Sequence, residues 1–205
     1  MLRKKRNQEH YYTALPNSDI KRGLIRTRLR GDHFEFMTAS SVFSKKRVDM
    51  GTRLLIESMA LPSSGRVLDV GCGYGAVGIA AAHFNTSLQV VLTDVNMRAV
   101  RLTRENIERN KVSNAEVRCG FLYEPVEDLT FNCVLSNPPV SAGMDTVRAI
   151  IAEAPKIMMT KASLQMVIRS KIGGKTLPAV FEGVFGNCQV LAREGGYRVL
   201  IAEKQ

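Results

Sequence analysis

The stretch VLDVGCGYGAVGIA, residues 67–80, constrains the fold of this chain more than any other feature. A short apolar run ends near Asp69, three glycines follow at alternate positions, and small apolar residues continue the chain. This pattern is typical of a buried strand that turns through glycines into a helix. In an open α/β sheet, such a turn lies at the carboxyl edge of the strands, where ligands bind. The glycines are Gly71, Gly73 and Gly75.

The rest of the chain alternates between strand and helix patterns from residue 66 to about residue 190. This alternation predicts an α/β fold, with a parallel sheet and helices on both faces. Gly195 and Gly196 separate two final strand-like runs, so we expect a closing hairpin that adds an antiparallel strand. Pro155 should break the helix expected over 144–159. Strands are expected at 66–70, 88–95, 115–120, 131–137 and 163–170, and the other helices at 48–61, 96–112 and 175–185.

Residues 23–38 alternate between apolar and polar side chains around Gly31 and Asp32, which predicts a β-hairpin. Its polar face carries Arg26, Arg28 and Arg30. We therefore divide the chain into a basic N-terminal extension with this hairpin, residues 1–47, and a second unit, residues 48–205.

Positive charge is concentrated near the N-terminus. The chain has 29 Lys and Arg against 19 Asp and Glu, which gives a net charge of +10. Residues 1–53 hold 13 basic and 5 acidic residues, so this segment alone carries a net charge of +8. This concentration favours a phosphate-rich partner such as nucleic acid, although a merely solubilising surface is the alternative. The residues predicted to contact this partner are Arg26, Arg28, Arg30, Phe43, Lys45 and Lys46.

The composition fits a soluble globular protein, with 45% hydrophobic and 23% charged residues. No run approaches the about 18–20 apolar residues that a membrane helix needs, and the basic N-terminus lacks the apolar segment of a secretion signal. We expect a cytoplasmic protein without a membrane partner, as a monomer or weak homodimer. The 4 cysteines and 3 histidines lack metal-ligand spacing, so we expect no metal and no disulfide framework.

The glycine loop alone fits two classes of cofactor. Gly71, Gly73 and Ala76, followed by Asp94 about 20 residues later, match the fingerprint of dinucleotide-binding proteins. S-adenosylmethionine binds to loops of the same kind. Asp69 favours S-adenosylmethionine, because a carboxylate there would repel a pyrophosphate but attract the cationic methionine end. Asp94, at the end of the next strand, is placed for a ribose diol.

The sequence SNPPV, residues 136–140, gives the chain a rigid exit from the strand over 131–137. Each proline fixes its own φ, and each restricts the residue before it. The side-chain oxygen of Asn137 and the carbonyl of Pro138 can each accept one N–H of an amine, which aims the nitrogen lone pair. We therefore predict that Asn137, Pro138 and Pro139 form the catalytic group for methylation of a nitrogen on a planar system.

The motifs LDVGCGYG, TDVN and SNPP resemble those of the class I S-adenosylmethionine-dependent methyltransferases. The resemblance implies a Rossmann-like, seven-stranded, mostly parallel sheet with an antiparallel last strand. It also implies that the loop and its preceding acid hold the methionine end of S-adenosylmethionine. The implied cofactor-binding residues are Asp69, Gly71, Cys72, Gly73, Gly75, Asp94, Val95, Phe121 and Asn137.

The further motifs VFSKKRVDMGTRLLIE, NPPVSAG, VFGNC and GGYRVL are similar to the small-subunit ribosomal-RNA guanine-N2 methyltransferase family, in its short single-domain form. This resemblance implies methyl transfer to N2 of a guanine in RNA, either ribosomal RNA or an assembling small subunit. The chain departs from the family at Phe121, where an acid is usual, and at Ser141 and Met144, where basic residues are common. Val140 stands where many related enzymes have an aromatic residue.

Two other functions stay open from the residues alone. The Asn-Pro-Pro chemistry suits a protein glutamine amide or a small-molecule amine equally well, and Val140 offers no ring to stack on a base. The departures at Phe121, Ser141 and Met144 would also suit a non-catalytic RNA-binding or assembly factor that has kept the fold.

Overall fold

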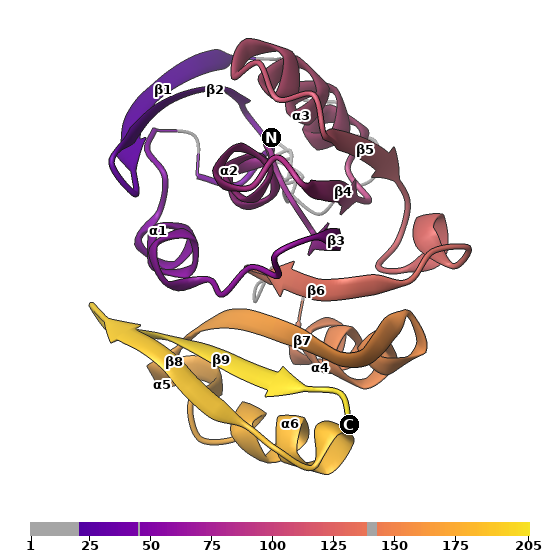
Figure 1. Cartoon of the computed structure of the whole chain (residues 1–205). Helices are drawn as coiled ribbons and strands as arrows, with labels where there is room; N and C mark the ends of the chain where they lie inside the picture. Colours follow the sequence, from indigo (N-terminus) through magenta and orange to yellow (C-terminus); the bar gives the residue numbers. More distant parts are fainter. Residues whose placement is uncertain (1–20, 45, 139–142) are drawn as a thin grey trace, which may run out of the picture.

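The computed structural model describes residues 21–44, 46–138 and 143–205, which are built around a seven-stranded sheet (Figure 1). The strand order is β5-β4-β3-β6-β7-β9-β8. Neighbouring strands are parallel from β5 to β7, whereas β9 runs antiparallel to both β7 and β8. The predicted α/β class, the seven strands and the antiparallel last strand are confirmed. The strands are β3 (Gly65–Val70), β4 (Leu88–Asp94), β5 (Ala115–Cys119), β6 (Phe131–Ser136), β7 (Met158–Arg169), β8 (Gln189–Glu194) and β9 (Tyr197–Glu203).

Helices cover both faces of the sheet, and each face has its own apolar core. Helices α1, α2 and α3 share one buried cluster with the N-terminal hairpin. Helices α4 and α6 share the second cluster with the other face of the sheet. Figure 1 shows these two groups on opposite sides of the strands. The helices are α1 (Met50–Ser58), α2 (Ala76–Phe84), α3 (Met97–Arg109), α4 (Met144–Glu153), the short α5 (Ser170–Gly173) and α6 (Leu177–Phe185).

Single residues explain where two of these helices begin and end. The Asn96 side chain caps α3, because its oxygen accepts hydrogen bonds from the N–H groups of Arg98 and Ala99 at 2.9 and 3.3 Å. Helix α4 ends at Glu153, and Pro155 lies in a separate 3₁₀ turn. The expected break is confirmed, since proline cannot donate the hydrogen bond that would continue the helix.

Strands β1 (Arg22–Leu29) and β2 (Asp32–Ala39) form the predicted hairpin, with Leu29 opposite Asp32. The turn consists of Arg30 and Gly31, whose φ angles are 46° and 96°. Positive φ at both positions is what a type I′ turn requires. The predicted turn at Gly31 and Asp32 is wrong by one residue, because Asp32 already pairs in β2.

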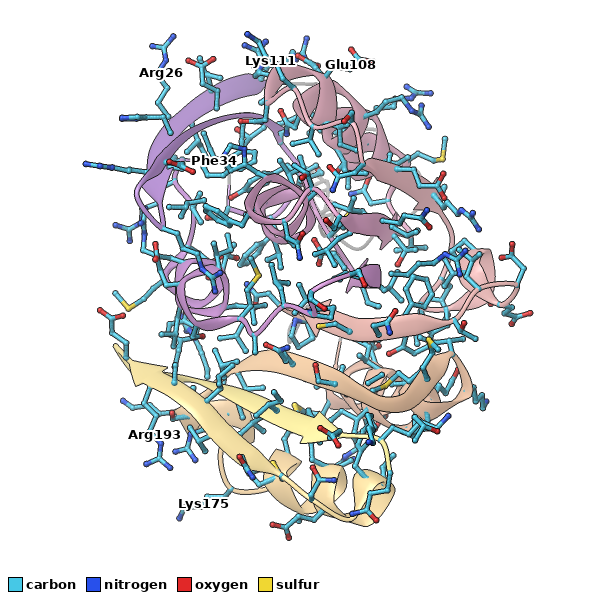
Figure 2. The ribbon with its side chains drawn as sticks, in the orientation of Figure 1. Arg26, Phe34, Glu108, Lys111, Lys175 and Arg193 are labelled. Atoms are coloured by element: carbon cyan, nitrogen blue, oxygen red, sulfur yellow. The ribbon has the colours of Figure 1, made fainter. Side chains whose placement is uncertain are left out.

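The hairpin lies against α3, where side-chain amides take the place of strand partners. Asn106 accepts a hydrogen bond from the N–H of Met37 at 2.7 Å and donates one to its carbonyl at 3.0 Å. Figure 2 shows Phe34 pointing inward from the hairpin, whereas Arg26 points away from the body. The division of the chain after residue 47 stays a prediction, since the apolar side chains of the hairpin belong to the same core as α2 and α3.

Candidate active site

A cleft of about 240 Å³ opens at the carboxyl edge of the sheet, where β3, β4 and β6 end. Parallel α/β sheets bind their ligands at this edge. The start of α1 closes one side of the cleft through Thr52, and the loop after β5 closes another through Leu122. The predicted site residues that line the cleft are Phe43, Asp69, Gly71, Cys72, Gly73, Asp94, Val95, Phe121, Asn137 and Pro138.

The glycine loop is held by backbone hydrogen bonds to the end of β4. The N–H of Gly71 donates to the Thr93 carbonyl at 2.9 Å. Gly73 has a φ of 62°, and a Cβ atom built there would meet no atom within 4 Å, so the backbone borders open space. Gly75 is not among the residues that line the cleft. Its φ of 91° and the 2.9 Å between its Cβ position and Thr103 Cγ2 make it a structural requirement of the turn.

Asp94 holds the glycine loop and faces the cleft with the same carboxylate. One oxygen accepts the N–H of Gly73 at 2.8 Å, and the other accepts the N–H of Asn96 at 2.8 Å. Burial raises the pKa of Asp94 to about 6. A carboxylate has about four acceptor positions, so Asp94 can still accept hydrogen bonds from a diol. This fits the predicted ribose contact.

Asp69 is an acid buried at the floor of the cleft, with 1% of its surface exposed. Its Oδ2 accepts the N–H of Gly78 at 2.8 Å. Burial, with a smaller contribution from the charge of Asp94, raises the pKa of Asp69 to about 7. Two acids that repel one another in a mostly apolar cleft are an unfavourable arrangement in the free protein. A cationic ligand would relieve it, so these residues fit the ammonium and ribose groups of S-adenosylmethionine.

Asn137 follows β6 at the rim of the cleft, and its side chain is held by helix α1. Its Nδ2 donates to Thr52 Oγ1 at 2.8 Å and lies 3.4 Å from Asp49 Oδ2. Pro138 lines the cleft beside it, whereas Pro139 lies outside the described residues. Sequence reasoning missed Asp49 and Thr52. Both lie within the motif VFSKKRVDMGTRLLIE. The sequence did not show that they meet Asn137, from which 88 and 85 residues separate them.

Apolar groups make up the side of the cleft near the ends of β4 and β5. Phe121 is 47% exposed, so its ring is available to a flat ligand. Val95 directly follows Asp94, the acid that ends β4, and it also lines the cleft. Burial raises the pKa of the Cys72 thiol well above its usual range, so Cys72 contributes a small, uncharged surface.

The segment that carries Phe43 is tied to the first turn of α3. The Asn96 side chain donates to the Ser41 carbonyl at 2.8 Å, and the Arg98 guanidinium donates to the Ser40 carbonyl at 2.9 Å. These bonds keep Phe43 at the cleft. Lys46 is exposed but is not among the lining residues, and Lys45 lies outside the described residues.

The hairpin arginines do not line the cleft. Arg26 forms an ion pair with Glu35 at 2.7 Å, and Arg28 donates to the Gly31 carbonyl at 2.6 Å. Arg30 donates to the Met59 carbonyl at 2.5 Å, just past the end of α1. Since α1 begins beside Asn137 and ends beside Arg30, the turn lies at the far end of that helix from the cleft. Contact between these arginines and RNA stays a prediction.

Within the described ranges, no helix is long and apolar enough to cross a membrane. The same residues contain no group of three or more His, Cys, Asp or Glu side chains that could hold a metal ion. All four cysteines are free thiols. The absence of a metal and of a membrane partner stays a prediction.

Two sequence comparisons relate this chain to known proteins. An uncharacterized protein of Bacillus subtilis, YbxB, is 37% identical over 198 residues, which cover 96% of this chain and 98% of YbxB. Ribosomal RNA small subunit methyltransferase C of Photorhabdus laumondii is 30% identical over 172 residues. That match covers 82% of this chain but 49% of the relative. The chain therefore spans about half the length of relatives of the second kind.

A solved structure has the same fold, and a family model identifies the chain. The Thermus thermophilus 16S rRNA N2 G1207 methyltransferase RsmC, in complex with AdoMet and guanosine, superposes with a TM-score of 0.80. The two are 24% identical, and the match covers 93% of this chain and 52% of that one. The model of the methyltransferase small domain matches residues 33–201. The chain thus belongs to the methyltransferase small-domain family of S-adenosylmethionine-dependent enzymes.

Proposed function

We propose that this enzyme methylates the exocyclic amine, N2, of a guanine in RNA, and that the RNA is ribosomal. The observation that carries the proposal is the position of Asn137 at the rim of the cleft that Asp69 and Asp94 line. A hydrogen-bond acceptor for the target amine therefore lies next to a site for a cationic methyl donor. The names of the Photorhabdus and Thermus relatives support ribosomal RNA as the substrate class.

Several cleft residues would hold the cofactor. S-adenosylmethionine supplies an electrophilic methyl group on a sulfonium centre. Asp69 would attract its ammonium group, directly or through water, and Asp94 would accept hydrogen bonds from its ribose. Val95 and Phe121 would pack beside its adenine. The open space at Gly73 admits the methionine chain close to the backbone.

Asn137 and Pro138 would position the amine. The lone pair of an exocyclic amine is conjugated with the ring, which makes the nitrogen a poor nucleophile. The Asn137 side-chain oxygen and the Pro138 carbonyl would each accept one of its two N–H bonds. Both hydrogen bonds strengthen as the nitrogen becomes tetrahedral and gains positive charge, so they stabilise the transition state. The surplus proton can leave to water, so the reaction needs no strong base.

The base must leave its stack to reach this cleft, and Phe43 is the described aromatic residue that we propose to stack on it. Arg26, Arg28, Arg30 and Lys46 would contact phosphates farther along the RNA. We propose that the protein acts in the cytoplasm, as a monomer or weak homodimer, on ribosomal RNA or an assembling small subunit. Family membership favours an enzyme over a non-catalytic assembly factor.

Transfer of a labelled methyl group from S-adenosylmethionine to undermethylated small ribosomal subunits tests the proposal. We expect label in the RNA, and its loss when the acceptor fraction is treated with ribonuclease beforehand. Label that survives ribonuclease would contradict the RNA assignment. It would favour the alternative substrates, a protein glutamine or a small-molecule amine.

A further inference from the structure

The proposed reaction depends on which way the Asn137 side chain is turned. An asparagine amide has nearly the same shape in its two flipped orientations. Only the orientation with the oxygen toward the cleft can accept an N–H of the target amine. In the other orientation, the Asn137 NH2 group would meet the amine as a second donor, and no hydrogen bond would form.

Hydrogen bonds at the start of helix α1 determine which atom of the Asn137 amide, the oxygen or the nitrogen, faces the helix. Asp49 caps the helix, and its Oδ1 accepts the N–H groups of Gly51 and Thr52 at 2.9 and 3.3 Å. Its Oδ2 makes a short hydrogen bond with the Thr52 hydroxyl. A carboxylate can only accept, so the single hydroxyl proton of Thr52 must point toward Asp49.

Thr52 passes this polarity on to Asn137. Because the Thr52 hydroxyl donates its one hydrogen bond to Asp49, the Thr52 oxygen can only accept hydrogen bonds from other partners. The Asn137 side-chain nitrogen lies 2.8 Å from that oxygen and 3.4 Å from Asp49 Oδ2. An Asn137 oxygen in the same place would face a lone pair and a carboxylate, which is repulsive. The nitrogen therefore faces the helix, and the oxygen is left for the cleft.

Asp49, Thr52 and Asn137 thus form a hydrogen-bonded relay, and its surroundings disfavour other arrangements. Thr52 is 5% exposed, so solvent does not compete for its hydroxyl. A Cβ atom on Gly51 would lie 2.9 Å from the Tyr197 ring, so this ring covers the first turn of α1 closely. Arg169 in turn donates to the Tyr197 hydroxyl at 2.8 Å. These contacts hold the first turn of α1 against β9 and β7, beside Asn137.

We propose that Asp49 and Thr52 are positioning residues that fix the flip of the Asn137 amide and so present its oxygen to the substrate amine. The inference rests on the proposed function for its catalytic meaning. Its structural content, the orientation and bonding of one side chain, is independent of what the substrate is.

Thr52→Val and Thr52→Ser are the first test. Valine keeps the shape of threonine but removes the acceptor, whereas serine retains it. We expect Thr52→Val to lower kcat by about 10- to 100-fold, the range for losing a hydrogen bond linked to a charge. KM and the Kd for S-adenosylmethionine should change less than about twofold, and Thr52→Ser should recover most of the activity. Thr160→Val, the same change at an exposed position near the start of β7, is the control.

Asp49→Asn is the sharper variant, because asparagine caps a helix as well as aspartate does. Its oxygen is needed by the N–H groups of the first turn, so its NH2 group would face Thr52. The Thr52 hydroxyl would then donate to Asn137 instead of accepting from it, which turns the Asn137 oxygen away from the cleft. We expect a loss of kcat at least as large as in Thr52→Val, with an unfolding temperature close to that of the native protein.

A nuclear magnetic resonance measurement separates this inference from the proposed function. The side-chain NH2 signals of Asn137, assigned by their loss in Asn137→Ala, should exchange slowly in the native protein and in Thr52→Ser. They should shift and exchange faster in Thr52→Val. If those signals respond as described while no RNA is methylated, the relay stands and the proposed function fails. Signals unchanged by Thr52→Val, or full kcat in that variant, would overturn the relay.

Discussion

Replacing Asp69 by asparagine should change stability and cofactor affinity in opposite directions. Asp69 is buried, and burial with the nearby charge of Asp94 raises its pKa from an ordinary 3.8 to about 7. The charged form is thus disfavoured in the folded, ligand-free protein. Asparagine keeps an oxygen for the Gly78 N–H, which Asp69 Oδ2 accepts at 2.8 Å, but it carries no charge.

The magnitude follows from the difference between the folded and unfolded pKa values. About three pKa units at about 1.36 kcal/mol each give an upper limit on the order of 4 kcal/mol for ionising Asp69 in the fold. Between pH 4 and pH 7 the folded state binds more protons than the unfolded state, so stability falls as the pH rises. It then levels off above pH 8. The unpaired NH2 group of asparagine offsets about 1–3 kcal/mol of the gain.

We therefore expect Asp69→Asn to be about 1–3 kcal/mol more stable than the native protein at pH 8, and no more stable at pH 4. Urea unfolding at both pH values measures this difference. Affinity for S-adenosylmethionine, measured by calorimetry at pH 8, should fall by about 10- to 100-fold, because its ammonium group loses a charged partner. Asp145→Asn, at a side chain that is 98% exposed, should change neither quantity. Loss of stability in Asp69→Asn at pH 8 would refute a buried, uncompensated charge.

Two further variants probe the glycine loop and its acid. Asp94→Ala should raise the Kd for S-adenosylmethionine by at least about 10-fold, and an unchanged Kd would contradict the ribose contact. The affinity of the native protein should rise from pH 5 to pH 8, because burial raises the pKa of Asp94 to about 6 and the ionised carboxylate is the better acceptor. Calorimetry measures both quantities, and an affinity that does not change with pH would contradict the second statement. Gly75→Ala should lower the free energy of unfolding by about 1–3 kcal/mol, since the φ of Gly75 is 91°. The control is Gly183→Ala, in open space within α6, which should be neutral or slightly stabilising. Equal stabilities of the two variants in urea unfolding would contradict the structural role of Gly75.

The sequence predicted the cofactor side of the cleft because that side is local. Asp69, Gly73 and Asp94 each lie at or just after the end of a strand, and parallel strands bring their carboxyl ends to one edge. Recognising the strands was enough to bring these residues together. Asn137 follows the same rule at the end of β6.

The substrate side was harder to predict, since it depends on packing between distant segments. Asp49 and Thr52 reach Asn137 only because α1 lies beside the end of β6, and no local pattern specifies that contact. The alternation in β1 correctly predicted an exposed face that carries Arg26 and Arg28. It contained no information on where the hairpin lies relative to the cleft, and hydrogen bonds to Asn106 in α3 decide that position.

The identity of the methylated atom tests the proposed function most directly. Ribosomal RNA from cells that lack this protein would be incubated with the purified enzyme and labelled S-adenosylmethionine, digested to nucleosides and analysed by mass spectrometry. We predict labelled N2-methylguanosine with the native protein, and about 100-fold less or none with Asn137→Ala, whose affinity for S-adenosylmethionine should stay within about twofold. Label in another nucleoside, or equal label with Asn137→Ala, would contradict the assignment of Asn137 as the acceptor for a guanine amine.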